Sequence, residues 1–263
     1  MTSATLSNTE TDSVIPAAKL KPKEHGAYAI LGIPIVTSLL IAGISVPGVC
    51  VAIASATGFL AHEPLLVAWG HRGSRAQRTT PAAMQRLSTL IAITIASGSV
   101  ALVTGSIPVR LALLGCLVLA TSSFALAVAG NHRTLGGQLW GIVGLSVPCV
   151  PILLAGEIPT PQTMEIWITW LIGFTATTMA VRGVIAAQKR NARTIHWFTI
   201  STLSLLVIVL TFLQYRFGIV TLPMLVMSFI LMIWPPPAKH LKRVGWTLVV
   251  GTVATAIWMT IAS

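Results

Sequence analysis

Two residues able to take part in acid–base chemistry, His62 and Glu63, lie next to each other inside a long apolar run of the sequence. An ionisable side chain within a segment long enough to cross a membrane is costly to insert, so it marks a candidate functional site. Histidine and carboxylate side chains are also common general acids and bases. We therefore expect His62 and Glu63 to be catalytic, together with His25 in the segment PKEHGAY at residues 22–28.

A second group of residues has the chemistry to hold an anion. Arg72, Arg133 and Arg182 each carry a planar guanidinium group, which matches a phosphate or carboxylate with two parallel hydrogen bonds. Gln138 follows Arg133 at the start of another apolar run. These four residues are the expected substrate-binding residues.

Plain structural roles also explain several of these residues. Glu24 can cap a helix that begins near His25, and Glu63 can be an ordinary acid at the end of a span. Arg182 can extend its guanidinium group to the lipid head groups. The sequence leaves both kinds of role open.

The composition places these residues in a membrane protein. Of the 263 residues, 54% are hydrophobic and 9% are charged, and the mean hydropathy is +0.85. Soluble domains have about 25% charged residues. The net charge of +11 does not indicate a nucleic-acid partner, because the basic residues stand in short groups between apolar runs and form no continuous stripe.

Apolar runs of about 20 residues are long enough to cross a bilayer. Breaks rich in Gly and Pro divide the chain into nine such runs. We expect an all-α transmembrane helical bundle, residues 23–263, after a disordered cytoplasmic tail, residues 1–22. Eight spans is the alternative count. The nine expected spans cover residues 27–45, 48–69, 88–105, 109–130, 136–155, 165–186, 196–215, 218–235 and 244–262.

The positions of the basic residues predict the topology. With a cytoplasmic N-terminus, fifteen of the seventeen Lys and Arg residues fall on the cytoplasmic side, and only Arg110 and Arg216 fall outside. This distribution is typical of a multi-pass protein of the bacterial cytoplasmic (inner) membrane. All the candidate residues then lie at one level of the membrane. Glu63 and Arg182 lie at matching depths, so we expect them to form an ion pair.

The outer side is expected to carry little function. Its acids, Glu157 and Glu165, are best explained as solvated loop residues. No ionisable residue lies near the middle of a predicted span, where the proton relays and substrate sites of proton-coupled carriers are usually found. The sequence therefore disfavours a proton-coupled pump or carrier.

Several motifs together resemble the YwiC-like family of bacterial membrane proteins. The most specific is KEHGAY at residues 23–28, and shorter ones are HEP at 62–64, GHRG at 70–73, the segment 133–138, VRG at 181–183 and KRVG at 242–245. The resemblance spans most of residues 20–250 and implies a membrane protein without implying a particular reaction. The family pattern has Glu where this chain has Gln138.

The expected architecture also resembles, more distantly, the UbiA-type intramembrane prenyltransferases. Those enzymes hold Mg²⁺ and a prenyl diphosphate on two aspartate-rich motifs at the ends of the second and sixth spans. This chain has a single aspartate, Asp12, in the tail. A carboxylate-rich magnesium site is therefore not expected; we expect no metal ligands, and the sequence does not identify a cofactor.

Three classes of function stay open. The first is an enzyme that acts on an anionic lipid or an isoprenoid-like substrate at a basic pocket on the cytoplasmic side. The second is a carrier for a small anion, which the lack of a polar outer entrance disfavours. The third is a non-catalytic assembly or accessory protein. The expected partners are the lipid bilayer and an anionic lipid or isoprenoid ligand; the sequence does not identify a protein partner.

Overall fold

The computed structural model describes residues 25–71, 73–131, 134–237 and 241–263. Every regular element within these ranges is a helix, which confirms the predicted all-α fold. The expected disordered tail, residues 1–22, lies outside the described residues. The helices are α1 (His25–Ala42), α2 (Val46–Ala68), α3 (Ser74–Thr79), α4 (Ala82–Thr104), α5 (Ile107–Val128), α6 (Leu135–Ser146), α7 (Cys149–Ala155), α8 (Thr160–Gln188), α9 (Thr194–Phe212), η2 (Ile219–Thr221), α10 (Leu222–Ile233) and α11 (Leu241–Ala262).

Within the described ranges, the apolar helical segments correspond to the nine predicted spans. Seven are long and apolar enough to cross a membrane, and two more, Gly26–Ala42 and Ile219–Ile233, are shorter apolar helices. The fifth predicted span consists of α6 and α7, which meet at Val147 and Pro148. Proline has no backbone N–H, so it interrupts the hydrogen bonding of a continuous helix there.

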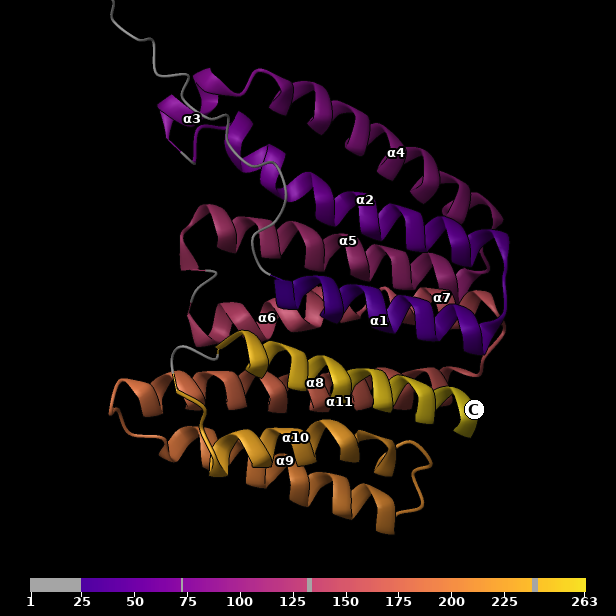
Figure 1. Cartoon of the computed structure of the whole chain (residues 1–263). Helices are drawn as coiled ribbons and strands as arrows, with labels where there is room; N and C mark the ends of the chain where they lie inside the picture. Colours follow the sequence, from indigo (N-terminus) through magenta and orange to yellow (C-terminus); the bar gives the residue numbers. More distant parts are fainter. Residues whose placement is uncertain (1–24, 72, 132–133, 238–240) are drawn as a thin grey trace, which may run out of the picture.

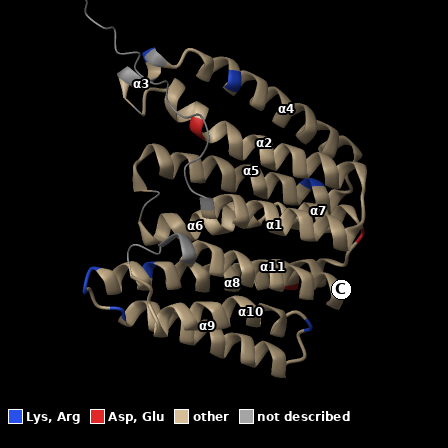
Figure 2. Ribbon diagram, viewed as in Figure 1, with Lys and Arg blue, Asp and Glu red and all other residues tan. Residues whose placement is uncertain are grey.

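The long helices lie side by side with roughly parallel axes (Figure 1). Helices α2 and α4 form one edge of the bundle and α9 lies at the other edge. Since successive spans run in opposite directions, α1, α4, α6, α9 and α11 begin at the end where α2, α5, α8 and α10 finish. Lys and Arg residues gather at this end, near α3 and at the α8–α9 turn, on the left of Figure 2. We call it the basic end.

Helix α8 is the most enclosed of the seven long spans. In the apolar 18-residue stretch of α8, 61% of the residues are buried, compared with 11% in those of α4 and α9 and none in that of α5. At its centre Trp170 is fully buried and stacks on Phe174 with 5.4 Å between ring centroids. Large apolar side chains on α4, α5 and α9 remain exposed, as expected for helix surfaces that face lipid. The bundle is therefore built around α8.

A close contact fixes the opposite end of the bundle. Gly156, directly after α7, lies against Ala42, the last residue of α1. A Cβ atom at position 156 would overlap with the Cβ and the backbone carbonyl oxygen of Ala42. Backbone cannot move aside as the tip of a flexible side chain can, so this position requires glycine.

We predict that Gly156→Ala destabilises the detergent-solubilised protein by about 1–3 kcal/mol, the usual cost of overpacking. The matched control is Gly115→Ala in α5, where an added Cβ meets nothing within 4 Å. Thermal unfolding of both variants would show the difference. Equal melting temperatures would contradict the contact between Gly156 and Ala42.

Candidate functional site

A hydrogen bond between two of the predicted substrate-binding residues joins α6 to α8. Nη1 of Arg182 donates to Oε1 of Gln138 at 2.9 Å. Arg182 lies six residues before the end of α8, and Gln138 is the fourth residue of α6. Thr134 caps the start of α6, where its Oγ1 accepts from the backbone N–H of Gly137 at 3.1 Å. The cap places Gln138 in the first turns of α6, within reach of Arg182.

Arg193 lies directly before α9, in the same region. From the sequence it was expected only as one of the fifteen basic residues on the cytoplasmic side, not as a site residue. Its Nη2 donates to the backbone carbonyl of Met232 and lies 3.4 Å from the Met232 sulfur. Its guanidinium carbon is 5.9 Å from the centre of the Trp197 ring, a cation–π distance. Met232 belongs to the last turn of α10, so Arg193 stabilises the negative end of that helix. Its Nε is buried without a hydrogen-bond partner among the described residues.

His196 completes this group. It lies in the first turn of α9, three residues after Arg193. Helix α8 packs against it next to Arg182, because a Cβ atom at Gly183 would stand at an ordinary contact distance of 3.5 Å from the Cβ of His196. The Nδ1 atom of His196 is buried and has no hydrogen-bond partner in the described part of the chain. We call Gln138, Arg182, Arg193 and His196 the basic cluster.

No carboxylate of the neighbouring helices neutralises the basic cluster. Arg182 is bound to a neutral amide, and Arg193 to a backbone carbonyl and a sulfur atom. No Asp or Glu follows Glu165 in the sequence, so the basic end of α8 and all of α9, α10 and α11 lack acids. Two guanidinium groups and an unpartnered imidazole nitrogen therefore lie together without a counter-ion from these helices.

The expected ion pair between Glu63 and Arg182 is not formed, although the structure describes both residues. Glu63 is buried in α2, which packs mainly against α4 and α7. Helix α8 instead packs mainly against α10, α9 and α6. Each residue lies five or six positions before the end of its helix at the basic end, but the two belong to different parts of the bundle.

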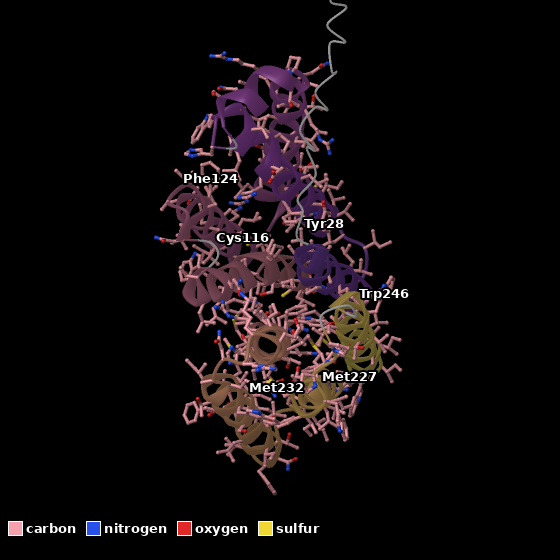
Figure 3. The ribbon with its side chains drawn as sticks, turned by 60° about the vertical axis from the view of Figure 1, so that its left-hand side comes forward. Tyr28, Cys116, Phe124, Met227, Met232 and Trp246 are labelled. Atoms are coloured by element: carbon pink, nitrogen blue, oxygen red, sulfur yellow. The ribbon has the colours of Figure 1, made fainter. Side chains whose placement is uncertain are left out.

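His62 also lies apart from the basic cluster. Its ring meets Phe124 of α5 edge to face, with 6.3 Å between centroids, and Trp69 meets the same Phe124 ring at 5.4 Å. Figure 3 shows Phe124 and Met232, the contacts of His62 and Arg193, in different halves of the molecule. The structure thus joins Arg182 with Gln138 but does not bring His62 to them.

The remaining predicted site residues cannot be placed. Arg72 and Arg133 lie outside the described residues, as does the side chain of His25, although α1 begins at that residue. Within the described part of the chain, no three His, Cys, Asp or Glu side chains come close enough to hold a metal ion.

An apolar groove of about 210 Å³ lies between α1 and α2. Small residues, Gly32, Ala52 and Ala56, leave the space, and the Tyr28 and Phe59 rings meet edge to face in its wall with centroids 5.0 Å apart. The Tyr28 hydroxyl is the polar exception in an apolar lining. Such a groove suits a hydrocarbon chain better than a polar molecule.

Comparison with known proteins supports one of the resemblances. Residues 22–152 match the family model described as YwiC-like protein. This segment of the chain is YwiC-like. The YwiC-like segment runs from before α1 into α7, so it contains the apolar groove, His62, Glu63 and Gln138 but not Arg182. The VRG and KRVG motifs lie beyond it. No curated protein and no solved structure matches the chain, so the resemblance to UbiA-type enzymes stays a prediction.

We predict that Gln138→Glu raises the melting temperature of the solubilised protein. A carboxylate at this position would accept a charge-assisted hydrogen bond from Arg182, which is stronger than the present bond to an amide by about 1 kcal/mol. Gln138→Leu, which removes the acceptor, should lower the melting temperature. If Gln138→Glu is no more stable than the parent, Arg182 already has a charged partner and the description of the basic cluster is wrong.

Proposed function

We propose that this protein binds the anionic head group of a lipid or an isoprenoid-like molecule at the basic cluster. The observation that carries the proposal is the hydrogen bond of Arg182 to the neutral Gln138, at the end of α8 where no Asp or Glu of the neighbouring helices lies. A guanidinium group has five N–H donors, and the amide oxygen of Gln138 satisfies one of them. An anion would use the others and neutralise the charge.

Depth supports a lipid as the source of that anion. Counting 1.5 Å per residue, Arg182 lies roughly 9 Å from the basic end of α8. This is close to the level of the head groups of a membrane leaflet, where anionic lipids attract basic side chains. The apolar groove between α1 and α2 supports the same class of ligand, because a groove of this kind accommodates a hydrocarbon chain.

The distribution of Lys and Arg residues supports an orientation of the bundle in the membrane. The basic end carries the Lys and Arg residues near α3 and of the α8–α9 turn, and Arg110 and Arg216 belong to the opposite end. Under the positive-inside rule the basic end faces the cytoplasm, in the inner membrane of a bacterium. The head-group site would then belong to the cytoplasmic leaflet.

A catalytic role would depend on residues outside the basic cluster. His25, His62 and Glu63 stay the candidate acids and bases, and they belong to α1 and α2 within the YwiC-like segment. His62 and buried Glu63 would act on a substrate only if the ligand reaches from the basic cluster across the bundle. The alternative is an accessory protein that holds the lipid without transforming it.

We predict that Arg182→Lys reduces the amount of phosphatidylglycerol retained on the purified protein by roughly tenfold. Lysine keeps the charge but loses the planar fork that binds a phosphate with two hydrogen bonds. Arg190→Lys is the matched control, because Arg190 is exposed at the same end of α8. Native mass spectrometry after mild detergent extraction measures the retained lipid. Equal retention by both variants would contradict the proposal.

The Gln138→Glu variant separates lost binding from lost stability. Its carboxylate should neutralise Arg182, so the variant should be more stable than the parent but retain less phosphatidylglycerol. Retention at the parental level by this more stable protein would show that the ligand does not use Arg182.

A further inference from the structure

A second concavity lies at the end of the bundle opposite the basic cluster. It has a volume of about 340 Å³ and opens between the start of α8 and the turn that follows α9. Gln162, Glu165 and two prolines form the wall on the α8 side. Tyr215, Arg216 and Phe217 form the other wall. We call it the outer pocket.

The two walls of the outer pocket are held firmly together. Phe217 is 1% exposed and forms part of the main hydrophobic core. Its backbone carbonyl accepts a hydrogen bond from Oγ1 of Thr169 in α8 at 3.2 Å. At the end of α9, Gln214 adopts a left-handed conformation with φ of 62°, and the N–H of Tyr215 donates to the carbonyl of Leu210 at 3.0 Å. This is the hydrogen-bond pattern that ends a helix in a defined turn. The pocket is therefore a built feature and not a gap between loose loops.

The charges in the outer pocket differ from those of the basic cluster. Glu165 and Arg216 both line the pocket, but they form no ion pair with each other, although the structure describes both. The guanidinium carbon of Arg216 lies over the Phe217 ring, 5.8 Å from its centre. Glu165 was expected to be a solvated loop residue, yet it lies in the second turn of α8 with its side chain in the pocket lining. One site thus presents a carboxylate and a guanidinium group separately.

We propose that the outer pocket binds a zwitterion whose ammonium group lies at Glu165 and whose phosphate or carboxylate group lies at Arg216. A ligand with a single charge would satisfy one of the two side chains and be repelled by the other. A zwitterion of matching length satisfies both. Gln162 and Tyr215 add neutral donors and acceptors beside the charges.

Two sources carry this chemistry: the phosphoethanolamine head group of a membrane lipid, and a free zwitterion dissolved in water. The pocket lies at the level of a membrane surface, so both can reach it. This proposal concerns a different end of the bundle from the basic cluster and does not depend on the function proposed there.

The test measures the melting temperature of the full chain in detergent with phosphoethanolamine, with inorganic phosphate and with short-chain phosphatidylethanolamine. We expect phosphoethanolamine or the lipid to stabilise the protein and phosphate alone to have little effect. Stabilisation by the lipid alone identifies a lipid head group, and stabilisation by both identifies the free zwitterion as sufficient. Equal shifts with phosphate and phosphoethanolamine, or no shift with any probe, would overturn the proposal.

Two substitutions test whether the stabilising probe binds in the outer pocket. Glu165→Gln and Arg216→Gln should each weaken the apparent affinity for the effective probe roughly tenfold or more, since each removes a charged hydrogen bond. Glu157→Gln is the control, because Glu157 lies near the same end but does not line the pocket. For each of the three variants, the shift in melting temperature is measured relative to that variant without ligand, and this shift is compared with that of the parent. If Glu157→Gln weakens binding as much as Glu165→Gln, the zwitterion does not occupy the outer pocket.

Discussion

The hydrogen bond from Arg182 to Gln138 joins the buried helix α8 to α6 without neutralising the charge that it carries. An ionised side chain near hydrocarbon needs a counter-ion or access to the head groups. The helices around the basic end of α8 offer neither Asp nor Glu, because α6 contains no acid and the chain contains none after Glu165. Arg193 adds to the same local charge and also stabilises the end of α10. The case for an anionic ligand rests on this imbalance.

Helix α8 connects the two candidate sites. Its 29 residues carry Glu165 near one end and Arg182 near the other, and its middle is the most enclosed part of the bundle. Trp170 and Phe174 are buried in that middle, between the outer pocket and the basic cluster. A protein with one head-group site at each membrane surface would contact lipid in both leaflets. This arrangement fits a lipid-handling protein better than a carrier with a continuous polar path.

The helical segments were predictable from the sequence, whereas their lateral neighbours were not. Hydropathy and the Gly and Pro breaks predicted the helical segments, including the boundary near Gly156, because burial in lipid acts on each segment separately. The same reasoning placed Glu63 and Arg182 at one depth but wrongly paired them, since nothing in either segment says which helix packs beside it. Arg193 and His196, which lie at the same end of the bundle as Arg182, were not among the predicted site residues. Their spacing with Trp197 at the start of α9 was a signal that they share one helix face.

An experimental structure of the full chain in nanodiscs that contain phosphatidylglycerol would show directly whether an anionic head group occupies the basic cluster. We predict density for a phosphate group within hydrogen-bond distance of the Arg182 guanidinium group, with Gln138 still bound to the same side chain. Arg193 and His196 should lie beside that phosphate group. A carboxylate of the protein itself next to Arg182, or an Arg182 side chain directed to bulk water, would contradict the central claim.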